Sequence, residues 1–259
     1  MNTSTTQKLA IFGFTALFFV MYFGCDVTST ENKLQEKSRE IKKPGINIDR
    51  EIENIKHVLP KDDQADIELN LIDLEESSTD EQKVSAFKKL AGKWYSLGYP
   101  LISGHYAAKL AEIDNTEDAW GIAGTTNYLA MKSLEDADKR KYAQEQAISA
   151  LEKAISLNPL NVDHKINKAL CFVESEAPMQ GIMMLRELSE EHPDNAAVQI
   201  QLGRLSIRTN QWEKALERFV RVLELEPDNK EVHCYLVDVY KAQNDNEMAE
   251  KSSSICQTR

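Results

Sequence analysis

The residues of this chain that could do chemistry are isolated histidines, four cysteines and a run of carboxylates, and none falls in a catalytic pattern. No histidine sits in an H-E-x-x-H pair, which would bind zinc, or beside a G-x-S-x-G turn, which would present a nucleophilic serine. No G-x-x-x-x-G-K or G-x-G-x-x-G loop is present to hold a phosphate. We therefore predict that the chain is not an enzyme and needs no cofactor. The histidines are His57, His105, His164, His192 and His233.

The densest group of carboxylates lies between Asp62 and Glu81, where nine acids occur without a single base. So many oxygen ligands could bind a metal, and they could also belong to a hydrolase or transferase site. The EF-hand pattern, with acids on alternate positions around a central glycine, is absent from this run. We interpret the run as the solvated face of a helix, and we expect no metal site.

Three of the cysteines, Cys171, Cys234 and Cys256, fall within predicted helices, and without Cys25 their number is odd. No C-x-x-C pair is present, so neither a zinc site nor thioredoxin-like redox chemistry is indicated. We expect these three cysteines to serve as small buried apolar side chains. They leave open the compartment in which the chain works.

The elements that carry these residues follow a 34-residue period over residues 162–259. Along this ladder a proline recurs where a helix must end, and small residues recur at two fixed points where two helices can approach closely. The recurring sets are Pro159, Pro193 and Pro227; Gly181, Ala215 and Ala249; Ala169, Gly203 and Val237; and Phe172, Ser206 and Tyr240.

This pattern resembles the tetratricopeptide repeat family. The resemblance implies an all-α solenoid of about five helical hairpins over residues 83–259, with the clearest repeats over residues 162–251. One hairpin cannot bury its apolar faces alone, so three or more must stack. The resemblance further implies a right-handed superhelix, lined on its concave side by the first helix of each hairpin, that works as a protein-binding scaffold.

The hairpin expected over Asp114–Pro159 departs from the period. Trp120 resembles the opening of the motif and Ala147 matches its second helix, but the two are 27 residues apart, which is more than the motif allows. An insertion or a lengthened helix pair near Lys132–Lys141 accounts for the excess. Such an insertion maps to one face and is a candidate for partner specificity.

Residues 46–82 are expected to form N-terminal helices ahead of the array. Apolar residues at Ile48, Ile52, Ile55 and Leu59 follow helical spacing, so this stretch is predicted to be an amphipathic helix that Pro60 ends. Its expected role is to pack on the next helix as a cap.

An uncharged apolar run from Leu9 to Gly24 sets residues 1–25 apart from the rest. Its length is at the lower end for a membrane anchor. The small residue before Cys25 also resembles the end of a bacterial lipoprotein signal, which would make Cys25 a lipidation site, although Tyr22 departs from that pattern. A cleaved secretory signal is the third interpretation. Polar residues 26–45 would then form a stalk.

The sequence gives two opposite indications of the side of the membrane on which the body of the chain lies. Basic residues are more numerous after the run than before it, which by the positive-inside rule keeps the body in the cytoplasm. A short N-terminal signal normally exports the polypeptide attached to it. We expect export in a bacterial envelope, with a cytoplasmic body as the alternative. The formal charge of −11 argues against nucleic acid as a partner, and no small-molecule substrate is expected.

The resemblance also implies a partner-binding groove on the first helices of the clearest repeats. Arg204 and Arg208, one turn apart, could clamp a carboxylate there, or they could belong to a solvated helix face. Chaperone-binding members carry a lysine and an asparagine where Ile166 and Leu170 stand, so a chaperone tail is not expected. The groove would be lined by Ile166, Leu170, Val173, Ile200, Arg204, Ile207, Arg208, Cys234, Asp238 and Lys241.

The partly apolar lining of this groove favours a helix or an apolar peptide as the ligand. The leading interpretation is a membrane-tethered scaffold that collects partner proteins at a bacterial envelope. The alternatives are an accessory factor for an envelope process, such as outer-membrane, cytochrome or cell-wall biogenesis, and a receptor on an organelle membrane.

Overall fold

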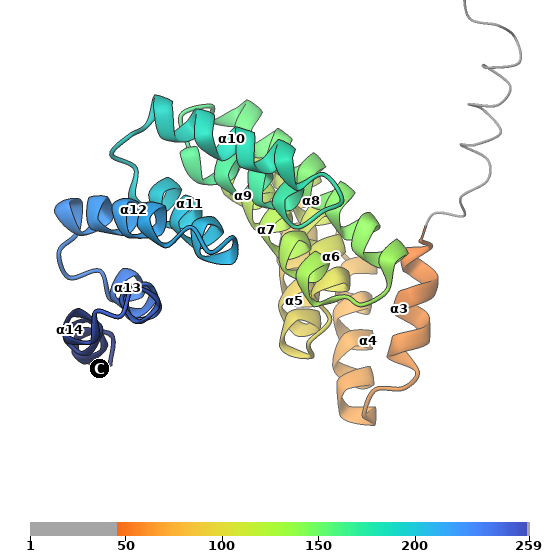
Figure 1. The fold of residues 1–259 in the computed structure, drawn as a ribbon. Helices are drawn as coiled ribbons and strands as arrows, with labels where there is room; N and C mark the ends of the chain where they lie inside the picture. The colour runs from red at the N-terminus through yellow and green to blue at the C-terminus, as the bar shows by residue number, and fades with distance from the viewer. Residues whose placement is uncertain (1–45, 258–259) are drawn as a thin grey trace, which may run out of the picture. The chain divides into compact units, whose positions relative to one another are not determined.

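The computed structural model describes residues 46–257, and every regular element in that range is an α-helix (Figure 1). The predicted all-α solenoid is confirmed for this part of the chain. The apolar run, Cys25 and the stalk lie outside the described residues. The helices are α3 Ile48–Lys56, α4 Lys61–Glu75, α5 Asp80–Ser96, α6 Pro100–Asp114, α7 Glu117–Ser133, α8 Ala137–Leu157, α9 Val162–Val173, α10 Pro178–Glu191, α11 Ala196–Arg208, α12 Trp212–Leu225, α13 Lys230–Ala242 and α14 Asn246–Cys256.

The starts of the later hairpins are fixed by asparagines that recur every 34 residues. Asn161, Asn195 and Asn229 precede α9, α11 and α13, and each side chain accepts a hydrogen bond from a backbone N–H in the first helical turn. Such caps satisfy donors that the helix leaves unpaired, and each contributes about 1 kcal/mol. The prolines before them end the preceding helices, as the ladder predicts.

The turns inside the first hairpin and the last two hairpins use residues that tolerate a left-handed backbone. Asn210 and Asn244, again 34 residues apart, have φ angles of 54° and 61°, and Gly98 has φ 83° in the first hairpin. Asparagine and glycine adopt this conformation at the lowest steric penalty. The chain can therefore reverse within a few residues, which lays the second helix of each pair back along the first.

Paired helices approach most closely at the small ladder residues. A Cβ atom placed on Gly181 of α10 would lie 2.3 Å from the carbonyl oxygen of Ala169 and 2.5 Å from the amide nitrogen of Val173, both on α9. On Gly203 of α11 it would lie 2.5 Å from the ring of Phe219 on α12. The absence of a side chain at these points sets how tightly each hairpin closes.

The hairpins share three main apolar cores. α3 and α4 pack with the first hairpins through Ile52 and Ile67, which lie in the same core as Leu90 and Trp94. A second core joins α9 and α10 to α11, and a third joins α11 and α12 to α13. Each core therefore crosses from one hairpin to the next, which is how stacking buries the faces that a lone hairpin leaves open.

The long second hairpin owes its extra spacing to helix length, since α7 has 17 residues and α8 has 21. Only residues 134–136 separate them.

The carboxylates of the acidic run lie on α4 and the start of α5, and several of them face lysines. Lys93 lies 2.9 Å from Asp63 and 2.6 Å from Asp66. None of the described helices is long and apolar enough to cross a membrane.

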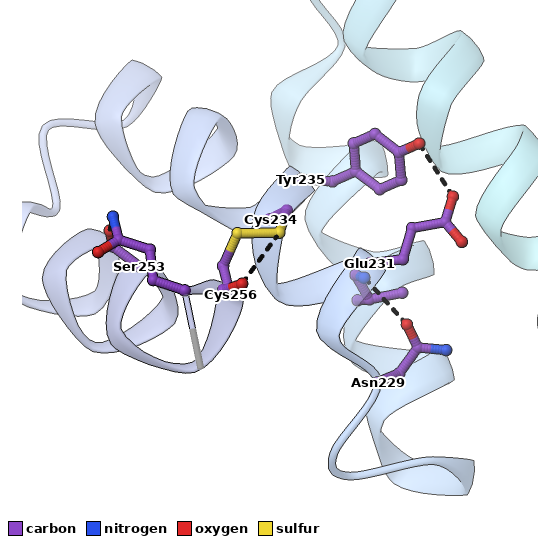
Figure 2. Close-up of a disulfide and its surroundings, with 8 residues drawn as sticks. Asn229, Glu231, Cys234, Tyr235, Ser253 and Cys256 are labelled. Carbon is purple, nitrogen blue, oxygen red and sulfur yellow. Dashed lines mark hydrogen bonds between the residues drawn. A yellow bond between two sulfur atoms is a disulfide. The ribbon is translucent and has the colours of Figure 1, made fainter. Parts of the chain in front are cut away.

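One expectation about the cysteines is wrong. Cys234 and Cys256 form a disulfide between α13 and the last turn of α14 (Figure 2). Cys171 is free and buried as expected. Because α14 folds back along α13, two cysteines 22 residues apart in sequence come together. Their spacing alone could not reveal this contact.

Replacing Gly181 with alanine is expected to lower the free energy of unfolding by about 1–3 kcal/mol, because the new methyl group meets backbone atoms of α9. Urea unfolding followed by circular dichroism measures the shift. Gly92→Ala is the matched control, since a Cβ there meets nothing within 4 Å, and it should stabilise its helix by about 0.5–1 kcal/mol. Equal midpoints for the two variants would contradict the close approach of α9 and α10.

Candidate partner-binding groove

The first helices of the hairpins form one face of the array, here called the inner face. α7 packs against α9, α9 against α11 and α11 against α13, so these helices make a continuous surface. α5 and α7, by contrast, share buried cores but leave a groove between them that α6 also lines. The inner face is therefore closed between α7 and α13 and open between α5 and α7.

Three of the predicted groove residues need correcting, because they are buried. Ile166 and Val173 are each 4% exposed and Ile200 is 8% exposed. Ile166 lies in the core that includes Val198 of α11, and Ile200 lies in the core that includes Val232 of α13. All three side chains lie in cores shared with neighbouring helices, so they stabilise the stack and have little surface to offer a ligand.

The two predicted arginines already have partners within the chain. Arg208 Nη1 donates to Glu174 Oε1 at 2.7 Å. Arg204 donates to Gln201 Oε1 at 3.1 Å, and its guanidinium lies 5.7 Å from the centre of the Tyr235 ring. A carboxylate ligand would have to displace Glu174 to reach Arg208. Leu170 and Ile207 are half-buried against the cores, while Asp238 and Lys241 are exposed.

Two tyrosines that the sequence patterns did not single out stand beside these arginines. Burial is the main cause that raises the pKa of Tyr128 on α7 to about 12, and the negative charge of Glu174 adds to it. Lys132 lies 5.6 Å from the centre of the Tyr128 ring. Tyr235 stacks on Phe219 at 5.4 Å between ring centres. Cations and aromatic rings thus alternate along the closed part of the inner face, where cation–π contacts contribute to its cohesion.

The open part of the inner face is a groove of about 710 Å³ between α5 and α7, here called the α5–α7 groove. Its large apolar side chains are Tyr95 on α5, 54% exposed, and Ile122 on α7, 62% exposed. Its floor is made of small or aliphatic residues, which leave room between the two helices. The floor includes Ala91, Gly92, Ala107, Leu110 and Ala119.

Charges of opposite sign stand on the walls of this groove, and one of its two carboxylates, Asp114, already accepts a hydrogen bond from the Thr116 hydroxyl. Lys88 lines the α5 side, and Asp118, in the first turn of α7, lines the other. Within the described residues neither side chain has a hydrogen bond or an ion pair. The groove therefore offers an apolar surface with a free cation on one wall and a free carboxylate on the other.

The register of the ladder could have pointed to Tyr95. Trp94 occupies the position of Phe172, Ser206 and Tyr240, so Tyr95 holds the position of Val173, Ile207 and Lys241. The signal was weak because the first hairpin matches the motif poorly. Ile122 has no equivalent position in the 34-residue ladder, because the lengthened second hairpin breaks the period.

The buried histidines have structural partners. His164 Nε2 lies 2.9 Å from Glu117 Oε1, and Asn158 and Asn161 also donate to the Glu117 carboxylate. His233 Nε2 lies 3.2 Å from the carbonyl oxygen of Pro227. No group of three or more histidine, cysteine or acidic residues in the described range could hold a metal. These contacts join hairpins and form no reactive centre.

The later hairpins match a known repeat family. A tetratricopeptide repeat family model matches residues 172–233, from the end of α9 to the start of α13. Over this stretch the sequence matches the tetratricopeptide repeat. Among solved structures, TTC0263, a tetratricopeptide repeat protein of Thermus thermophilus, is 16% identical, with 70% of this chain and 98% of that chain covered and a TM-score of 0.50.

Two further solved structures resemble this chain. MamA is 20% identical, with 62% of this chain and 86% of that chain covered, at a TM-score of 0.44. YrrB, described as a tetratricopeptide repeat protein with an unusual peptide-binding site, is 18% identical, with 73% of this chain and 91% of that chain covered, at a TM-score of 0.39. At 16% identity, the likeness to TTC0263 shows a shared fold and says nothing about the individual residues of the groove.

Protonation of Glu117 should weaken the joint between the second and third hairpins. Hydrogen bonds from Asn158 and Asn161, and then His164, lower the pKa of this carboxyl below 4.5. A lowered folded-state pKa gives stability that is present above the unfolded value and lost as pH falls through the folded value.

Glu117→Gln is therefore expected to be less stable than the unaltered chain at about pH 6, with a difference that shrinks towards about pH 3. Urea unfolding over this range measures it. A difference that does not change with pH would show that the Glu117 charge plays no part in the joint.

Proposed function

We propose that this chain is a protein-interaction scaffold, without catalysis of its own, that holds an apolar segment of a partner protein in the α5–α7 groove. The observation that carries the proposal is the exposure of Tyr95 and Ile122 on the inner face, beside a floor of small side chains. Large apolar side chains that stay exposed beside a groove mark interaction sites. An aromatic ring at the centre of such a site supplies much of the binding energy.

The lining charges suggest the direction in which a bound segment lies. An acidic side chain of the partner would meet Lys88 on α5, and a basic one would meet Asp118 on α7. Such pairing fixes register and orientation more than it raises affinity. The fitting ligand is an extended or helical apolar segment that carries one charge of each sign. This moves the predicted groove from α9–α13 to the first hairpins.

The groove proposal is tested by placing a photo-crosslinking amino acid at position 122 in the full chain. A defined partner protein should be trapped, and Tyr95→Ala should abolish the crosslink. The control is the same amino acid at Leu160, which is 88% exposed and lies outside the groove. With the purified partner, Ile122→Ser should weaken binding about tenfold or more. The same products from both positions, or unchanged affinity, would refute the proposal.

We also propose that the N-terminal run tethers the scaffold to a membrane. The support is the sequence from Leu9 to Gly24, which is apolar and uncharged, and the polar stretch after it. A helical anchor and a lipid on Cys25 are the two forms of this tether. A bacterial envelope is the proposed location. An accessory factor in envelope assembly and an organelle receptor are the alternatives, and loss of one defined envelope activity on deletion would favour the first.

The tether is tested by growing bacterial cells that express the full chain with a palmitate analogue and treating spheroplasts with protease. Label that is lost in Cys25→Ser, with the body digested from outside, is the result expected of an exported lipoprotein. Membrane association without label is the result expected of a helical anchor, and protease sensitivity then reports the side. Recovery of the whole chain in the soluble fraction would refute the tether.

A further inference from the structure

The disulfide joins two ladder positions that are occupied by apolar residues in the preceding hairpins. Cys234 lies 34 residues after Ile200 and 68 after Ile166, and Cys256 lies 34 after Val222 and 68 after Leu188. Ile166 and Leu188 share one core, and Ile200 and Val222 share the next. The covalent bond thus stands at two positions that, in each earlier hairpin, belong to one apolar core.

The last helix has lost the large apolar residue that holds its predecessor. α12 buries Phe219 completely, and the equivalent residue of α14, 34 positions later, is Ser253. Figure 2 shows Ser253 on the same helix as the disulfide-bonded Cys256. α14 has 11 residues, of which only Ala249 and Ser252 are buried. A helix of that length is marginal in water without tertiary contacts.

Cys234 also lacks the cover that the earlier residues receive. Ile166 and Ile200 lie in cores that include residues of the next first helix, α11 and α13 respectively. No further hairpin follows α14 in the described range, and the end of α14 reaches Cys234 instead, with 5.0 Å between the two Cα atoms. The bond therefore joins the two helices of this hairpin and brings the end of α14 over Cys234.

We infer that the last hairpin is sealed by oxidation, and that the repeat array therefore works in an oxidising compartment as a substrate of a dithiol–disulfide oxidase. One cysteine thiolate attacks the disulfide of the oxidase, which forms a mixed disulfide and releases one oxidase thiol. The second thiolate then attacks the mixed bond and releases the other oxidase thiol. Two chain thiols become one disulfide, the oxidase disulfide is reduced to two thiols, and the chain protons pass to solvent and the leaving thiolates.

Structural disulfides persist in exported and extracellular proteins and are rare in a reducing cytoplasm. The inference does not depend on the α5–α7 groove, since it concerns the opposite end of the array. The inference also concerns the side of the membrane on which the array lies. It favours export over the cytoplasmic location that the positive-inside rule indicates.

Thiol trapping tests the compartment. The full chain, with Cys25 and Cys171 replaced by serine, is expressed in bacterial cells with and without their periplasmic dithiol oxidase and alkylated at once with a polymer maleimide. The expected result is that Cys234 and Cys256 resist alkylation in the first cells and both react in the second. Free thiols in both cells would overturn the inference.

Hydrogen exchange of the purified full chain tests the sealing. Reduction, or Cys234→Ser with Cys256→Ser, should speed amide exchange in α14 about 100-fold and leave α5–α8 unchanged. Cys234→Ile with Cys256→Val, which restores the pair of the preceding hairpin, should recover protection under reducing conditions. Cys171→Ser alone is the control. Protection of α14 that does not change on reduction would show that the bond seals nothing.

Discussion

The structure depends on one constraint: the first helix of each hairpin has an apolar face that only the next hairpin can cover. Ile166 lies in one core with residues of α11, and Ile200 lies in one core with residues of α13. The same cores include residues of the second helices α10 and α12. Close approach of the paired helices, which Gly181 and Gly203 permit, brings these faces into register. The fold is therefore a chain of neighbour contacts, in which each hairpin stabilises the one before it.

Two places in the array do not satisfy this constraint in the ordinary way. Between α5 and α7 the cover is incomplete, because small residues line the space, and Tyr95 and Ile122 stay exposed there. At α13 no further first helix follows in the described range, and the bond from Cys234 to Cys256 supplies the cover. At the first place the cover is left open, and at the second a covalent bond supplies it.

The sequence predicted the parts of the structure that local chemistry controls. The 34-residue ladder predicted the later hairpins, and Pro193 and Pro227 mark where their second helices end. Properties that depend on neighbours were predicted less well. Ile166, Val173 and Ile200 were expected on an accessible groove, but their exposure is decided by how closely the next helix packs. Cys234 and Cys256 were expected to be apolar fillers, because the fold of α14 along α13 is not visible in their spacing. The α5–α7 groove was missed because its helices match the motif weakly.

The central claim, that the inner face is open at α5–α7 and closed from α9 to α13, is tested most directly by the labelling rate of single cysteines. In a chain with Cys25 and Cys171 replaced by serine and the native disulfide intact, Ile122→Cys and Ile200→Cys would be treated separately with a small maleimide. Ile122 is 62% exposed and Ile200 is 8% exposed, so position 122 should react at least about 100-fold faster. Equal rates, or faster reaction at position 200, would contradict the account.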